Sequence, residues 1–223
     1  MKSPLSRGIA AEFLGTAFLV AAVVGSGIMG ERLACGNVAI ALLANTIATG
    51  AALAALILAL RPISGAHLNP VISIAEALRS GIAWRDAALY IPAQICGGIA
   101  GTACANIMFA LPAVSISHHA RTGAPQWFSE FIATFGLLLV IRTVARFVPD
   151  WLPLAVAAYI VAAYWFTAST SFANPAVAIA RSLSDTFAGI RPADVPAFIA
   201  AQLAGGLSAA FVSDWLVFQP SED

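Results

Sequence analysis

Long apolar runs separated by short polar breaks dominate the chain. Six runs approach or exceed the length of one membrane crossing, which takes about 20 apolar residues. They cover roughly residues 8–30, 36–60, 87–111, 127–141 with its extension, 151–168 and 195–218. This pattern predicts six transmembrane helices. The first run follows Lys2 and Arg7 as a signal peptide would, but it is longer than a signal sequence and more runs follow, so we expect it to be retained.

Two polar interruptions, residues 64–71 and 170–177, each contain an Asn-Pro pair. The oxygen of an Asn side chain caps a helix, and Pro suits the first helical position. We therefore expect helices over 69–78 and 174–184. At ~1.5 Å per residue each reaches about 15 Å, half of a bilayer core of roughly 30 Å. Interfacial or loop helices are the alternative, but one half-span in each half of the chain is typical of a membrane protein with a site at its midplane.

The two halves of the chain repeat each other. Residues 11–16 match 129–134, the Asn-Pro segments match, and residues 93–98 match 201–206, in the same order. Each half carries three spans, an odd number, so the second copy must insert upside down. The sequence predicts one transmembrane domain, 1–223, of inverted repeats at about 1–111 and 127–223, an all-α fold of six spanning helices plus two half-helices.

Composition agrees with a membrane protein. Hydrophobic residues make up 60% of the chain and charged residues 10%, with a mean hydropathy of +0.88. These values exclude an ordinary soluble domain. Net charge is zero and no basic run occurs, so nucleic acid is not an expected partner. The three cysteines form neither a disulfide framework nor a metal-ligand spacing, and we expect no metal and no cofactor.

Basic residues are distributed unevenly between the two sides of the predicted topology. Seven fall on the side of the N-terminus and four on the other. The seven are Lys2, Arg7, Arg61, Arg79, Arg85, Arg142 and Arg146, and the four are Arg32, Arg121, Arg181 and Arg191. This bias predicts that both termini are cytoplasmic.

The paired boxes carry a family resemblance, together with four polar residues at matching places in the repeats. The boxes are Asn69-Pro70-Val71 and Asn174-Pro175-Ala176, and the four residues are Glu12, Glu130, Gln94 and Gln202. Over its whole length the chain resembles an aquaporin of the major intrinsic protein family. The resemblance implies a channel, not an enzyme, that is a homotetramer in the bilayer of the inner (plasma) membrane, with one pore in each monomer.

The physics of the boxes predicts a site for neutral polar solutes. Two helix N-termini that meet at the midplane each present about half a positive charge, which repels cations. The amides of Asn69 and Asn174 are donors for a passing oxygen. Backbone carbonyls before each box offer acceptors; these segments contain Gly65, Ala66, His67, Leu68, Phe172 and Ala173.

Glu12 and Glu130 are ionisable residues deep in spans, where a charge is expensive unless it has partners. They are either a proton-coupling pair or structural acceptors for loop N–H groups, and the resemblance favours the structural role. His67 either packs its ring beside the pore or gates it. Arg181 either lines the outer vestibule or pairs with Asp185, four residues on.

In the family, four positions counted from the boxes form the narrowest constriction, which places Thr49, Ala162, Ser171 and Val177 there. This set lacks the aromatic residue and the arginine that family members carry at those positions. The resemblance therefore implies an unusually wide, arginine-free filter that admits water and glycerol-like polyols. The run from 174 to 189 is similar to that of bacterial aquaporins associated with arsenic resistance, which adds arsenious acid as a candidate solute.

Other functions have less support in the sequence. The alternative of an ion- or proton-coupled secondary transporter, using Glu12 and Glu130, conflicts with the positive helix ends at the midplane. A junction or adhesion role conflicts with the short termini and loops. An enzyme would need a nucleophile and a base at a credible spacing, and the chain offers none.

Overall fold

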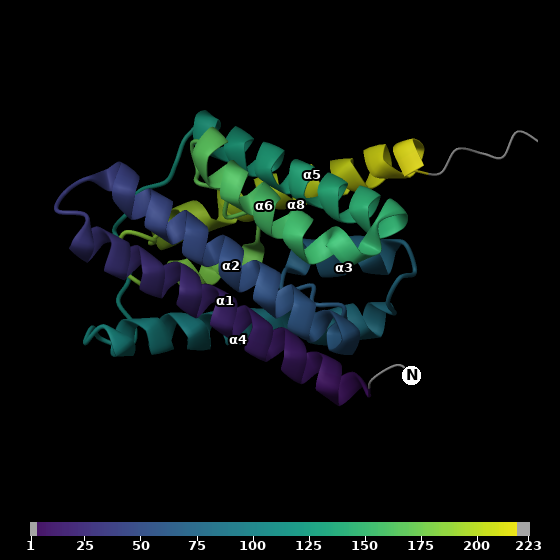
Figure 1. Ribbon diagram of the computed structural model, residues 1–223, viewed down its shortest axis with the longest axis horizontal. Helices are drawn as coiled ribbons and strands as arrows, with labels where there is room; N and C mark the ends of the chain where they lie inside the picture. Colours follow the sequence, from purple (N-terminus) through teal and green to yellow (C-terminus); the bar gives the residue numbers. More distant parts are fainter. Residues whose placement is uncertain (1–3, 218–223) are drawn as a thin grey trace, which may run out of the picture.

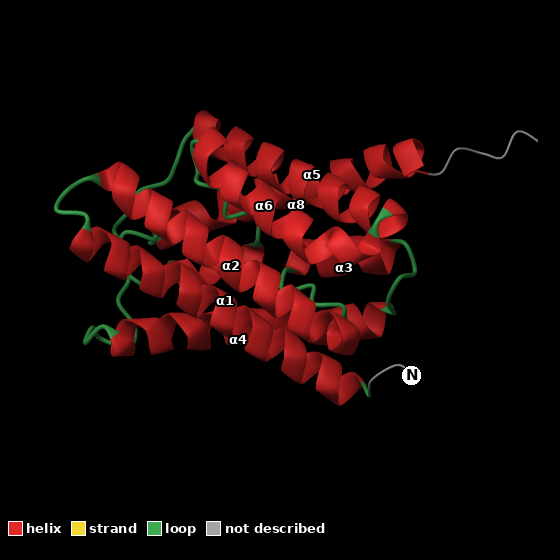
Figure 2. Cartoon of the chain, viewed as in Figure 1, coloured by secondary structure: helices red, strands yellow, loops and turns green. Residues whose placement is uncertain are grey.

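The computed structural model describes residues 4–217, and within that range it contains helices and loops without strands (Figure 1, Figure 2). Five helices are long: α1 Leu5–Leu33, α2 Val38–Ser64, α4 Trp84–Met108, α5 Ala124–Phe147 and α8 Val195–Val217. Three are shorter: α3 Pro70–Leu78, α6 Leu152–Phe166 and α7 Pro175–Arg181. Two single turns of 3₁₀ helix, η1 Pro149–Trp151 and η2 Pro192–Asp194, precede α6 and α8. Lys2, Phe218 and both chain ends lie outside the described residues.

The long helices match five of the predicted spans, and the helix in the remaining one, 151–168, is shorter than predicted. By length and composition, five helices are long and apolar enough to cross a membrane. The exception, α6, has 15 residues, about 22 Å at the helical rise. It ends at Phe166 because Thr167 takes an extended conformation and leads the chain back toward the second box.

Matching helices of the two repeats pack in the same way. α1 lies along α4, and α5 lies along α8 (Figure 1). Both contacts depend on glycine: a Cβ added at Gly97 would overlap the carbonyl oxygen of Phe13, and one at Gly205 would overlap that of Phe131. Small residues let helix backbones approach this closely in lipid. The internal repeat of the sequence is therefore visible as two equivalent tight helix pairs.

Both half-helices begin as predicted. The side-chain oxygen of Asn69 accepts a hydrogen bond from the N–H of Val71 at 2.9 Å, and α3 ends at Leu78. The side-chain oxygen of Asn174 accepts from the N–H groups of Ala176 and Val177, at 3.0 and 3.3 Å. Pro occupies the first helical position in each.

The second half-helix is shorter than the predicted 174–184. Beyond Arg181 the N–H groups bond three residues back, to Ile179, Ala180 and Arg181 itself, which tightens and ends the helix. The segment that follows pairs with the long loop between the repeats, because Ser115 and Ser117 donate their N–H groups to the carbonyls of 183 and 182.

The chain enters and leaves the bundle at one end. α1 begins, α8 ends and α3 lies at this end, which we call the N-terminal face (Figure 1). The opposite end, the distal face, carries the loops 34–37, 109–123 and 182–194. α3 runs from the middle of the molecule toward the N-terminal face, and α7 runs toward the distal face.

Candidate functional site

The loops that lead into the two boxes have the same unusual backbone. Ala66 and Leu68 have φ of 50° and 51°, and Ser171 and Ala173 have φ of 51° and 49°. A left-handed conformation is strained for residues other than glycine, so the surroundings must hold it in place. The holding groups come from the long helices.

A buried carboxylate fixes the first loop. Glu12 on α1 has no exposed surface. It accepts hydrogen bonds from the N–H groups of His67 and Leu68 at 2.9 and 2.6 Å, from the Ser64 hydroxyl at 2.6 Å and from the Gln94 amide at 2.8 Å. Four donors around one carboxylate are the pattern of a structural acceptor.

The equivalent carboxylate of the second repeat does the same. Glu130 on α5 is also fully buried. It accepts from the N–H groups of Phe172 and Ala173, both at 2.9 Å, and from the amide of Gln202 at 2.6 Å. The polar residues shared by the two repeats are therefore the ones that hold both box loops.

The two boxes meet at the start of the half-helices. The amide of Asn69 donates to the carbonyl of Ala173 at 2.7 Å, and the amide of Asn174 donates to the carbonyl of Leu68, also at 2.7 Å. Pro70 and Pro175, the next residues in each box, are buried behind them. Each amide thus holds the partner box and still has a second N–H.

A cavity of about 340 Å³ passes both asparagines. Part of its lining comes from the two box loops, with residues 65–69 and 171–174. The apolar part of the lining, which we call the apolar wall, consists of side chains of α1, α2, α5 and α6: Leu19, Val23, Leu53, Ile57, Leu137, Ile141, Val156 and Ile160. A cavity with both polar and apolar lining suits a solute that carries both kinds of surface.

The distal part of the cavity contains three of the four residues predicted for the constriction. Thr49, Ser171 and Val177 line it. The buried hydroxyl of Ser171 has no hydrogen-bond partner among the described residues. Its oxygen has almost no accessible surface, so the side chain must rotate before the hydroxyl can meet a solute.

The fourth prediction, Ala162, is wrong. Ala162 is exposed on α6 and does not line the cavity; Ile160 and Tyr164 line it instead. Residues two positions apart on a helix point in nearly opposite directions, so a count that is off by two selects the wrong face. Tyr164 donates its hydroxyl hydrogen to the Thr49 hydroxyl at 3.3 Å, which brings an aromatic residue to this part of the cavity.

Of the two places predicted for Arg181, the structure favours the one beside the cavity. Arg181 is 2% exposed and lines the cavity together with Val177. Its Nε donates to the carbonyl of Ala188, and its guanidinium carbon lies 3.4 Å from the centre of the Phe172 ring. Side chains on a helix lean toward its N-terminus, so an arginine one turn beyond Val177 reaches back toward the same region.

A second arginine supports this arrangement. The guanidinium of Arg121 lies 5.1 Å from the centre of the Phe172 ring. It donates to the carbonyls of Gly189, Ser169 and Phe187, at 2.8, 3.3 and 3.5 Å. Arg121 therefore ties the loop between the repeats to both sides of the second half-helix.

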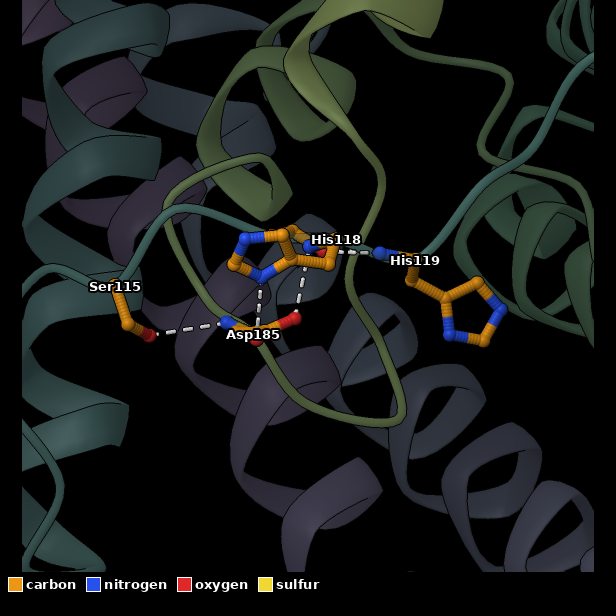
Figure 3. A network of polar contacts seen from close by, with 5 residues as sticks. Ser115, His118, His119 and Asp185 are labelled. Carbon is orange, nitrogen blue, oxygen red and sulfur yellow. Dashed lines mark hydrogen bonds and ion pairs between the residues drawn. The ribbon is translucent and has the colours of Figure 1, made fainter.

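Asp185, the alternative partner of Arg181, bonds elsewhere. Figure 3 shows its carboxylate accepting from the N–H of His118 and contacting the ring of His118, both at 2.9 Å, while Ser115 contacts its N–H. The backbone bond from His118, followed by the side-chain bond, lowers the pKa of Asp185. The neighbouring His119 ring points away from this network (Figure 3), and burial, followed by the nearby Arg121, lowers its pKa.

At the N-terminal face the cavity is lined by three titratable side chains, Arg61, His67 and Glu76. The His67 ring hydrogen-bonds to the Ser73 hydroxyl at 3.0 Å and meets Tyr90 edge-on at 5.7 Å between ring centres. Its place is beside the cavity, with its backbone held by the loop network.

Sequence reasoning did not single out three residues that matter here. Tyr164 could have been predicted to line the cavity, because it follows Ile160 by four positions and so lies on the same face of the helix. Glu76 could have been predicted to do so as well, because it follows its box asparagine by seven positions, as Arg181 does. Arg121 carries no signal of its own, because a loop arginine is normally solvated.

Comparisons with known proteins agree with this fold. The family model described as major intrinsic protein matches residues 1–149. The chain is 54% identical to aquaglyceroporin AqpS of Rhizobium meliloti over 97% of this chain and 92% of that protein, and 34% identical to aquaporin NIP3-1 of rice (Oryza sativa subsp. japonica) over 63% and 45%. The X-ray structure of the aquaglyceroporin from Plasmodium falciparum has the same fold, with a TM-score of 0.76, 24% identity and coverage of 95% of this chain and 96% of that one.

Proposed function

Because the chain belongs to the major intrinsic protein family, a family of membrane channels and not of enzymes, we propose that it is a passive channel for water, glycerol and other small uncharged solutes. One observation carries the proposal: a single cavity passes the meeting point of both half-helix N-termini. Positive helix ends oppose cations there, and carbonyls and amides replace the hydration of a neutral solute.

The selectivity filter in this proposal consists of Thr49, Tyr164, Ser171, Val177 and Arg181. Val177 stands at the position where family members carry the filter arginine, and its smaller side chain leaves space there. Arg181, one turn further along the half-helix, reaches into this space and supplies hydrogen-bond donors. Ser171 supplies an unpaired hydroxyl once its side chain turns toward the solute. The apolar wall accepts the carbon backbone of a polyol while these groups bind its hydroxyls.

A proton-coupled transporter is less well supported. Coupling needs carboxylates that exchange protons with the pathway, but Glu12 and Glu130 are fully buried and bonded to loop N–H groups. Protonation would remove acceptors that the strained box loops need. A passive pore needs these carboxylates only as fixed hydrogen-bond acceptors for the loops.

The proposal extends to assembly and location, where the family resemblance and the charge bias are the support. We place the channel as a homotetramer in the inner (plasma) membrane. The N-terminal face, with Arg61, Arg79, Arg85 and Arg142 near it, would then be cytoplasmic.

Stopped-flow light scattering of proteoliposomes tests the function. We expect water and glycerol to cross faster than in empty liposomes, in both directions and without a pH gradient. Urea and arsenious acid belong in the same series, because arsenious acid is neutral and presents three hydroxyls as glycerol does. Purified, folded protein that adds no glycerol permeability would overturn the proposal.

Substitution of Arg181 tests the filter. Arg181→Ala enlarges the distal opening and should raise glycerol and urea permeability relative to water, whereas Arg181→Lys keeps the charge and much of the volume. Arg146→Ala, at an exposed position of α5, is the matched control. Equal solute ratios in all three variants would show that Arg181 does not filter.

A further inference from the structure

The inverted repeat pairs Glu76 with Arg181. Asn69 and Asn174 are equivalent, and both Glu76 and Arg181 follow their asparagine by seven positions. Both side chains line the cavity. Because the repeats are inverted, the acid lies toward the N-terminal face and the base toward the distal face.

The cavity has an unequal distribution of charge. Among the described residues that line it, three are charged: Arg61, Glu76 and Arg181. The two half-helix N-termini add positive charge in the middle. Glu76 is therefore the one acidic side chain on a pathway that is positive at the distal end, at the centre and, through Arg61, at the N-terminal face.

The surroundings of Glu76 leave its carboxylate free to act on the cavity. No described residue makes a hydrogen bond or an ion pair with it, and Arg61 instead donates to the carbonyl of Pro149 at 2.6 Å. Gly81, whose N–H bonds to the carbonyl of Glu76 at 2.9 Å, leaves the space that the carboxylate occupies, because a Cβ there would overlap the Glu76 carboxylate.

A positive pathway excludes cations but attracts anions. Arg181 and the helix ends alone would favour small monovalent anions over the neutral solutes of the proposed function. A carboxylate at the mouth repels anions and so reverses this preference locally. Glu76 lies seven residues beyond Asn69, about 10 Å by helical rise, and at that distance in a partly solvated site its charge still acts appreciably on an ion near the helix ends.

We infer that Glu76 is a specificity-determining residue that keeps small anions out of the pore and so restricts the channel to uncharged solutes. The inference rests on the proposed channel function. It assigns to the mouth at the N-terminal face a role opposite to that of the helix ends: they reject cations, and Glu76 rejects anions.

Chloride flux tests the inference. Proteoliposomes hold a chloride-quenched dye, and potassium with valinomycin balances the charge that chloride carries. We expect wild type and Glu76→Asp to pass no more chloride than empty liposomes. Glu76→Gln and Glu76→Ala should pass it at least about tenfold faster, a ratio equivalent to about 1.4 kcal/mol. Adding Arg61→Gln to Glu76→Gln should reduce the chloride flux again.

Glycerol flux in the same vesicles separates the two ideas. If wild type passes no glycerol, the proposed function fails. If wild type and the neutral variants pass glycerol but the variants leak no more chloride than Glu76→Asp, the inference on Glu76 fails and the function stands. Glu31→Gln, at an exposed position of α1, controls for loss of a carboxylate elsewhere; chloride leakage there equal to that of Glu76→Gln would also overturn the inference.

Discussion

Replacing Glu130 by Gln tests whether the buried carboxylates hold the box loops or couple protons. The substitution keeps the shape and removes the charge. In the structure three donors surround the carboxylate, from the backbone of Phe172 and Ala173 and from Gln202. An amide keeps one acceptor oxygen and turns its NH₂ toward a donor, so one buried donor loses its acceptor.

The expected cost follows from these contacts. One unsatisfied buried donor costs about 1–3 kcal/mol, and the bonds that remain lose roughly 1 kcal/mol of charge assistance. We expect Glu130→Gln to lower the free energy of unfolding by about 3 kcal/mol, or the melting temperature by roughly 5–10 °C. Glu31→Gln, at an exposed site on α1, should leave it unchanged.

Thermal unfolding in detergent, followed by tryptophan fluorescence, measures the loss, and proteoliposomes measure solute flux. The structural role predicts a less stable protein that still passes glycerol without a pH gradient. A variant with the stability of wild type whose flux had lost a dependence on the pH gradient would refute this reasoning and favour proton coupling.

Two further predictions concern single residues. Burial and the nearby Arg121 and Arg181 lower the pKa of His119. The unfolded chain therefore binds the proton first, and stability should decline as the pH falls below about 6.5, the ordinary pKa of histidine. Unfolding midpoints measured from pH 8 to 5 should decline less for His119→Gln than for wild type, and equal declines would contradict the assignment. Gly205→Val should push α8 away from α5, because even a Cβ overlaps the carbonyl of Phe131, and should reduce the yield of folded protein in size-exclusion chromatography far more than Gly136→Ala, whose Cβ meets only a tyrosine side chain.

Much of the fold could be predicted because its determinants are local. An Asn-Pro pair starts a helix through the capping oxygen of Asn and the fixed backbone of Pro, and a ten-residue helix is too short to cross a bilayer. The buried carboxylates could be assigned partners because a charge inside a membrane must have them. Each of these arguments uses residues close in sequence or a general cost of burial.

The lining of the distal part of the cavity was harder to predict, because it depends on helix phase and on side-chain reach. Ala162 was selected by counting back from Asn174 through residues 167–173, an irregular segment whose path the count does not encode. Arg181 was placed by its Cα, one turn beyond Val177, but a long side chain that leans toward the helix N-terminus reaches the Phe172 ring. Counting fixed positions from the box asparagines therefore misses an arginine whose side chain reaches this region from a different position on the helix.

The two repeats share the backbone and the side chains that build the centre of the pore, and they differ in the side chains at the two mouths. Caps, left-handed loop residues and buried carboxylates recur in both copies, and together they build the central region that any neutral polar solute has to pass. Equivalent positions beyond this region differ in charge, as Glu76 and Arg181 do. Because the copies are inverted, a substitution in one copy acts on one mouth only. If Glu76 rejects anions and Arg181 selects by size, as we propose, the two selections can change independently without altering the site at the midplane.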